Sequence, residues 1–139
     1  MRLRFVQLCD HTALDHAANP CLIGMFDQLN LPALPGGITR LHLMVSIAME
    51  PEDAHAQPII RCVLLDPDGQ IEFGVEAELF TGDTLDRPVA YLRFPEVDIP
   101  LTQFGTHRWE VQLEDGTVLG HDLLNVRQSE QLAFGTASM

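Results

Sequence analysis

The chain has 139 residues, of which 46% are hydrophobic and 20% are charged, a composition typical of one ordinary soluble domain. Twenty acidic residues against eight basic ones give a formal net charge of −12, which predicts repulsion from nucleic acids and from anionic membrane surfaces. All the basic residues are arginine, so Schiff-base chemistry and P-loop nucleotide binding, which both need a lysine, are excluded.

The first residues are similar to the start of an export signal, because two arginines precede an apolar run. Gln7 interrupts this run and Asp10 ends it, before it reaches the length of about 7–15 apolar residues that a signal peptide needs. No stretch approaches the roughly 18 apolar residues of a membrane-spanning helix. Cys9, Cys21 and Cys62 are an odd number of cysteines without a CxxC pair, which favours reduced thiols over a disulfide framework. We therefore predict a cytoplasmic protein.

Apolar and polar residues alternate along three segments, which lie at residues 41–49, 71–80 and 108–114. Alternation with a period of two places one face of a β-strand on a core and the other face in water. Side chains on the apolar faces of these segments are predicted to meet in one core. They are Leu43, Val45, Phe73, Val75, Trp109 and Val111.

Turn sequences divide the chain into eight predicted strands. The sequences DPDG at residues 66–69 and EDG at residues 114–116 each join two strands, with a glycine where the turn takes a positive φ. Prolines break the remaining segments. The predicted strands are 2–9, 21–29, 39–49, 58–65, 70–80, 89–94, 106–113 and 117–126. Their short and regular spacing predicts an all-β fold, an antiparallel two-sheet β-sandwich that is immunoglobulin-like or jelly-roll-like.

Two segments lie outside the strand pattern. Residues 11–19 fit either a short helix with Asp10 as its N-cap or a structured loop. Residues 129–139 are small and polar, so we expect a flexible C-terminal tail. No linker or repeat interrupts residues 1–128, which are predicted to be one β-sandwich domain.

Three segments carry a resemblance to a known group of proteins. Residues 19–27 read NPCLIGMFD, residues 64–69 read LLDPDG, and residues 100–116 include GTHRWEV and LEDG. Together they resemble a family of uncharacterised small bacterial β-sandwich proteins over about residues 3–126, in which His107 takes the place of an aromatic residue. These are turn and core motifs, so the resemblance implies the sandwich fold and implies no activity.

Metal-ligand residue types gather at Cys9, Asp10, His11, Asp15 and His16. His11 and His16 lack the i, i+4 spacing that places two histidines on one helix face. The chain also lacks the HxH and HExxH motifs of common metal sites. Helix capping and loop solvation explain the same residues. We predict no metal and no cofactor, with His11, Asp15 and His16 as the candidates to test.

Nucleophilic side chains give no complete catalytic motif. Cys9 is the best candidate for a reactive thiol because His11 lies nearby in the sequence. Cys21 and Cys62 share strand faces with apolar residues, which predicts that both are buried in the core. Ser46 lies on the polar face of its strand and outside any GxSxG setting, so we predict a solvated hydroxyl.

The histidines and carboxylates are predicted to be structural or solvated. His42 lies opposite the apolar face of its strand, which predicts exposure. His107 shares a face with Trp109, which predicts partial burial with a hydrogen bond to a backbone group. His121 has apolar neighbours on its face, which is typical of a core or interface histidine. A solvated strand face is predicted for three glutamates, Glu72, Glu76 and Glu78.

Taken together, these patterns favour a non-catalytic module that binds a protein or another ligand through strand edges or loops. Two alternatives stay open. One is a small metal-dependent or hydrolytic enzyme that uses the segment Cys9–His16. The other is a structural component of a bacterial or phage assembly.

Two features favour a homodimer. Residues 29–37 form an apolar loop, which is typical either of an interface or of a loop folded over one end of the sandwich. Arg2 and Arg4 are the kind of charges that edge strands carry, so residues 2–9 are predicted to form an edge. Because each copy carries a charge of −12, the predicted dimer tightens as salt rises.

Overall fold

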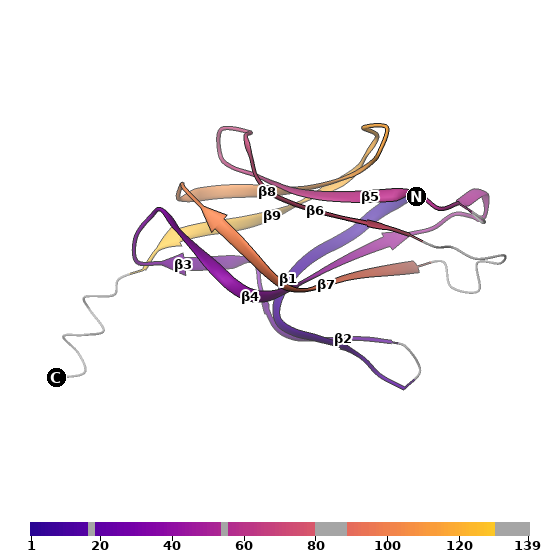
Figure 1. Cartoon of the computed structure of the whole chain (residues 1–139), viewed down its shortest axis with the longest axis horizontal. Coiled ribbons are helices and arrows are strands. Elements are labelled where there is room, and N and C mark those ends of the chain that lie inside the picture. Colours follow the sequence, from indigo (N-terminus) through magenta and orange to yellow (C-terminus); the bar gives the residue numbers. More distant parts are fainter. Residues whose placement is uncertain (17–18, 54–55, 80–88, 130–139) are drawn as a thin grey trace.

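The computed structural model describes residues 1–16, 19–53, 56–79 and 89–129. In chain order its elements are β1 (Arg2–Leu14), β2 (Pro20–Phe26), β3 (Gln28–Leu31), β4 (Gly36–Ala48), the 3-10 turn η1 (Pro51–Asp53), β5 (Ile59–Leu65), β6 (Ile71–Glu78), β7 (Val89–Leu101), β8 (Gly105–Leu113) and β9 (Val118–Gln128). One sheet has the order β2-β1-β4-β7 and the other β3-β9-β8-β5-β6. Figure 1 shows β5, β8 and β9 stacked over β4 and β7. The predicted all-β, two-sheet sandwich is confirmed. The predicted tail lies, except for Ser129, outside the described residues.

The core lies between the two sheets and contains the six side chains that the alternation predicts. Leu43 and Val45 of β4 are fully buried opposite Trp109 of β8, and Val111 is buried beside them. Phe73 of β6 lies edge-on to Trp109, with ring centroids 6.3 Å apart. Both predicted hairpins are present, because β5 pairs antiparallel with β6 and β8 pairs antiparallel with β9.

The predicted strand over residues 21–29 is in fact two strands in different sheets. The chain leaves β2 at Phe26, crosses to the other sheet and continues as β3. β3 then runs parallel to β9, with Leu29 beside Val126, so this sheet is mixed and not purely antiparallel. Leu29 and Leu31 are buried in the core. Of the two alternatives for this segment, these leucines follow internal packing and not an interface.

The first strand is longer than predicted and does not lie at an edge. Its first half pairs with β4, up to Cys9 beside His42, so β1 is an inner strand and Arg2 does not mark an edge. Residues 11–14 continue as strand and pair with β2, so the helix considered there, with Asp10 as its cap, is wrong. We call residues 10–14 together with β2 the arm. Figure 1 shows the arm projecting below β4 and β7.

Candidate functional site

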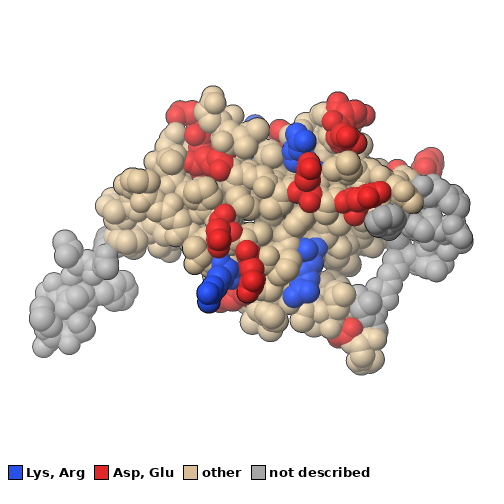
Figure 2. Space-filling model, viewed as in Figure 1, with Lys and Arg blue, Asp and Glu red and all other residues tan. Residues whose placement is uncertain are grey.

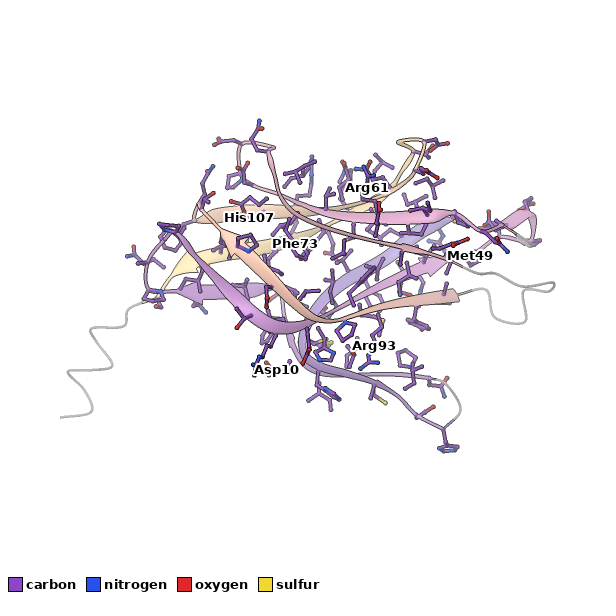
Figure 3. The ribbon with its side chains drawn as sticks, in the orientation of Figure 1. Asp10, Met49, Arg61, Phe73, Arg93 and His107 are labelled. Carbon is purple, nitrogen blue, oxygen red and sulfur yellow. The ribbon has the colours of Figure 1, made fainter. Side chains whose placement is uncertain are left out.

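The arm crosses the outer face of the four-stranded sheet and is tied to two of its strands. The backbone N–H of Thr12 donates to Nδ1 of His42 on β4 at 3.3 Å, and Thr12 Oγ1 lies 2.8 Å from the same nitrogen. Arg93 of β7 donates from Nε to Thr12 Oγ1 at 2.6 Å and from Nη2 to the Thr12 carbonyl oxygen at 3.1 Å. Figure 3 shows Arg93 on the side of β7 that faces the arm. One fully buried residue of the arm thus meets both strands.

These hydrogen bonds determine where the protons lie. A backbone N–H only donates, so Nδ1 of His42 carries no proton and the neutral ring holds its proton on Nε2. The Nε of Arg93 also only donates, so Thr12 Oγ1 accepts a hydrogen bond from it and donates one to Nδ1 of His42. The result is a directed chain of donors from Arg93 through Thr12 to a neutral His42.

Residues on the outer face beneath the arm are more buried than the sequence pattern indicates. His42 and Ser46 were predicted to be exposed on a polar strand face, and both are buried. Ser46 accepts a hydrogen bond from Nη1 of Arg4 at 2.9 Å, and the same nitrogen reaches the Tyr91 hydroxyl. The predictions failed because the arm and these long side chains cover a face that two-layer sandwiches usually leave in water.

The three cysteines occupy three different environments. Cys9 lies on the face that the arm crosses and is fully buried, and this burial, followed by the Asp10 carboxylate, raises the pKa of its thiol. A buried thiol with a raised pKa is a poor nucleophile, so the structure does not support Cys9, the best of the three candidates, as a reactive thiol. Cys62 is buried in the core as predicted, which raises its pKa to about 12. Cys21, also predicted to be core, is exposed on the arm.

The three metal-ligand candidates make separate contacts. The His11 ring lies against the His42 ring, with centroids 4.9 Å apart. Asp15 accepts a hydrogen bond from the backbone N–H of Asn19 at 2.8 Å, and His16 is exposed. Among the residues that the structure describes, no group of three or more histidines, cysteines or carboxylates is placed to hold a metal ion.

The arm carries a patch of exposed apolar side chains, which we call the apolar patch. Leu14 is 57% exposed, Ile23 58% and Met25 63%. Within the described chain β2 pairs with β1 alone, so its other edge is unpaired. The Asp10 carboxylate packs against Gly24, which has a φ of +68°. Any residue with a Cβ at position 24 would clash with this carboxylate. The sequence did not reveal the patch because the predicted strand 21–29 was placed wholly within the sandwich.

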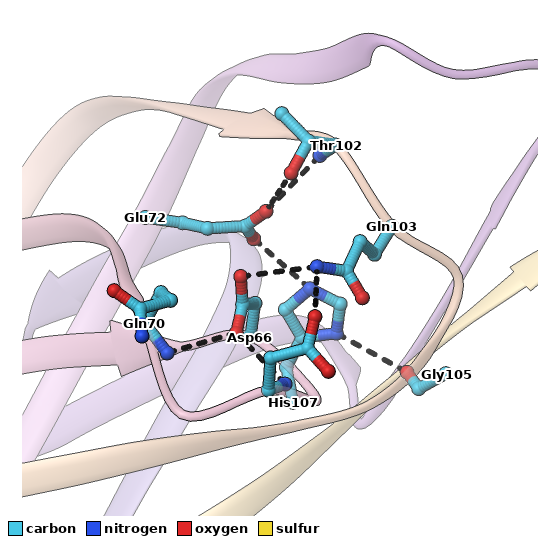
Figure 4. A network of polar contacts seen from close by, with 8 residues as sticks. Asp66, Gln70, Glu72, Thr102, Gln103, Gly105 and His107 are labelled. Atoms are coloured by element: carbon cyan, nitrogen blue, oxygen red, sulfur yellow. Dashed lines mark hydrogen bonds and ion pairs between the residues drawn. The ribbon is translucent and has the colours of Figure 1, made fainter.

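A second polar group closes one end of the sandwich (Figure 4). His107 of β8 is fully buried, with Nε2 2.9 Å from Oε2 of Glu72 and Nδ1 3.2 Å from the carbonyl oxygen of Gly105. The other oxygen of Glu72 accepts hydrogen bonds from the backbone N–H and the hydroxyl of Thr102. The pair thereby joins β6, β8 and the loop that follows β7.

The contacts of this pair indicate a structural role. A carbonyl oxygen only accepts, so Nδ1 of His107 carries a proton, and one further proton lies between Nε2 and Glu72. The hydroxyl of Thr102 donates to Glu72 and not to His107. The Thr102 hydroxyl is therefore not aligned with the His107 imidazole for nucleophilic catalysis.

Half of the polar group around His107 could be predicted from the sequence. The predicted burial of His107 and its hydrogen bond to a backbone group are confirmed. Glu72 was predicted to be solvated, but its side chain is only 7% exposed. The partners are 35 residues apart in the chain, and no local spacing signals the contact. His121, predicted to lie in a core or interface, is exposed and paired with Glu110 at 3.0 Å.

Comparison with known proteins identifies a family and no activity. Residues 4–126 match the model of a family described as a family of unknown function (DUF6941). No curated protein matches the chain. A crystal structure of an immunoglobulin-like protein from Pseudomonas aeruginosa is similar at 15% identity and a TM-score of 0.40, over 91% of this chain and 95% of that one. Among the described residues, no helix has the length and apolar character to span a membrane.

Proposed function

Since the chain belongs to the family of unknown function DUF6941, we propose its role from its own geometry: it is a non-catalytic interaction module, one domain over residues 1–128, that docks an extended segment of a partner protein on the arm. The observation that carries this proposal is the apolar patch beside the unpaired edge of β2. Unpaired edges add a strand from another chain through backbone hydrogen bonds, and exposed apolar side chains give that contact its affinity.

Charge defines the chemistry of the partner. Residues 5–39 contain no lysine or arginine, and three carboxylates around the arm, Asp10, Asp15 and Asp27, are exposed. Arg93 contacts the arm from β7, where its guanidinium is engaged by Thr12. Figure 2 shows acidic side chains outnumbering basic ones on the visible face as well. A partner with basic side chains complements this surface, whereas an acidic one is repelled. The occupant we propose is therefore an extended segment in which apolar residues alternate with arginine or lysine.

A short peptide that alternates valine with arginine tests this proposal. We expect saturable binding in fluorescence anisotropy, with affinity reduced about tenfold or more in Ile23→Asp, because the substitution puts a charge into the apolar contact. Leu123→Asp is the matched control, because Leu123 is 57% exposed on the other sheet and Ile23 is 58% exposed on the arm.

Two results would contradict the proposal. One is equal binding of a peptide that alternates valine with glutamate, since charge would then have no part in recognition. The other is an equal loss of affinity in Leu123→Asp and Ile23→Asp, since the acidic surface in general would then attract the peptide. Binding of a DNA duplex at physiological salt would contradict the charge argument in the same way.

The homodimer remains a prediction, now with the apolar patch as its contact in place of the Leu29–Leu34 segment. A second copy brings the same acidic arm, so association is expected to strengthen when salt screens the repulsion. Sedimentation velocity at low and high salt measures this. A monomer under both conditions excludes the second copy as the occupant of the arm, and concentration-dependent larger species would support the assembly alternative.

The contacts of Cys9 and the histidines support the enzyme alternative less than they support an interaction module. A hydrolytic site at Cys9–His16 requires a reactive thiol or a bound metal, and Cys9 is buried with a raised pKa. A cytoplasmic location agrees with three free thiols and is proposed on that ground.

A further inference from the structure

We propose that Arg93, Thr12 and His42 form a latch that holds the arm on the outer face of the sheet, and that protonation of His42 opens it. The inference rests on the proposed function in one respect only, namely that an open arm docks its partner less well. The arm and the sheet are joined here by three side chains from three strands, β7, β1 and β4.

The latch favours the neutral form of His42. Nδ1 is the acceptor for both the backbone N–H and the hydroxyl of Thr12. A proton on Nδ1 would point a second donor at the Thr12 N–H, so that hydrogen bond would be lost. The hydroxyl oxygen would then have to accept from Nδ1 and from Nε of Arg93 at once, with two cationic groups facing one oxygen. Protonation therefore breaks the N–H contact of Thr12 with His42 and sets the imidazolium against the Arg93 guanidinium, which disfavours the closed arm.

Burial and two of the three titratable or charged groups that face His42 oppose its protonation. From the arm comes His11, and from β7 come the Arg93 guanidinium and the Glu96 carboxylate. Burial lowers the pKa of His42 most, His11 and Arg93 lower it further, and Glu96 acts in the opposite direction. The stabilisation of the closed arm is thus complete above the ordinary histidine pKa of about 6.5 and is lost as the pH falls through the lowered value.

Opening the latch is expected to weaken docking. A closed arm presents the edge of β2 in a fixed position, so a partner strand binds without first ordering it. A released arm must be ordered again upon binding, which reduces the affinity. Acidification therefore turns docking off, and near-neutral pH turns it on.

The native cysteines report this opening without any labelling mutation. Cys21 is exposed on the arm, Cys9 is fully buried on the face that the arm crosses, and Cys62 is fully buried in the main core. A short pulse of a methanethiosulfonate reagent, followed by peptide mass spectrometry, gives the modification of each thiol. The Cys9 to Cys21 ratio removes the effect of pH on thiol chemistry, and Cys62 reports global unfolding.

At neutral pH we expect modification of Cys21 alone. At about pH 5, where a histidine of ordinary pKa is mostly protonated, we expect the Cys9 to Cys21 ratio to rise about tenfold or more while Cys62 stays protected. Continued protection of Cys9 at this pH would overturn the latch. Simultaneous exposure of Cys9 and Cys62 would also overturn it, because the whole domain would then be unfolding.

Two variants separate the latch from other effects of acid. His42→Asn keeps an acceptor oxygen near the position of Nδ1 that does not take up a proton in this range, so the Cys9 response to pH should disappear. His121→Asn, which changes an exposed histidine, should leave the response intact. Thr12→Val removes the hydroxyl and should expose Cys9 already at neutral pH. A response to acid that persists in His42→Asn would assign the opening to another group.

The thiol measurement needs no partner, so it fails or succeeds independently of the proposed function. If Cys9 becomes accessible at acidic pH but the valine–arginine peptide does not bind, the latch is supported and the docking role is contradicted. If the peptide binds, its affinity should decrease about tenfold on acidification in the native chain and change less in His42→Asn. Equal decreases in both proteins would show that the surface carboxylates, and not the latch, control docking.

Discussion

His107→Ala is expected to lower the free energy of unfolding by about 3–5 kcal/mol, because it leaves the buried Glu72 carboxylate without its partner. The two side chains are 0% and 7% exposed, and their nearest atoms are 2.9 Å apart. The substitution also leaves the Gly105 carbonyl oxygen without the donor that Nδ1 supplies. Urea denaturation followed by the fluorescence of Trp109, the one tryptophan of the chain, measures the loss.

The chain offers a matched control in a second histidine–glutamate pair. His121 lies 3.0 Å from Glu110, but the two side chains are 43% and 19% exposed. Water compensates for the loss of such a pair, so His121→Ala is expected to cost less than about 1 kcal/mol. Equal effects of the two substitutions would show that burial does not control the strength of these pairs. The double variant of His107 and Glu72 should cost less than the sum of the two single variants.

The period of the hydrophobic pattern was sufficient to predict the sandwich and its core. Alternation along β4, β6 and β8 identified the faces that meet, and Trp109 and Val45 lie where this pattern places them. Turn chemistry located both hairpins, because a glycine with positive φ at the end of a turn is a local requirement. These features depend on residues that are close in the chain, so one sequence is enough to predict them.

Alternation gives the period of a strand but does not show which of its faces is covered. Cys21 and His121 have apolar neighbours on their own faces, such as Met25 and Leu123, yet these neighbours are themselves exposed. Conversely, His42 lies on a polar face that the arm covers. The positions of these residues depend on the extension of β1 to Leu14 and on contacts between distant strands, which no local pattern encodes.

The docking surface and the latch share this origin. The crossing of the chain between sheets at residue 27 separates β2 from β3 and leaves the former with an unpaired edge. The extension of β1 beyond Cys9 then brings Thr12 to His42 and Arg93. The contacts of Thr12 with His42 and Arg93 join residues that are 30 and 81 positions apart in the chain. The sequence therefore indicated the residue types of the site but not their arrangement.

Trp109→Ala is expected to cost about 3–5 kcal/mol, through the loss of a large buried side chain and the cavity that it leaves. The indole is 1% exposed, and its residue pairs with Leu64 across β5 and β8. Phe73 packs edge-on against it, and such aromatic pairs contribute about 0.5–1.5 kcal/mol beyond the area that they bury. Because the variant lacks its fluorophore, thermal or urea unfolding is followed by circular dichroism.

The control for this substitution is Leu123→Ala, at a residue that is 57% exposed on the same sheet. Surface truncations of this kind usually change stability by less than about 0.5 kcal/mol. The native protein should also show the blue-shifted emission of an indole out of water. A red-shifted emission, or a Trp109→Ala variant as stable as Leu123→Ala, would contradict the placement of Trp109 between the sheets. A side chain that both layers enclose cannot be removed without leaving a cavity in the core or exposing it to water.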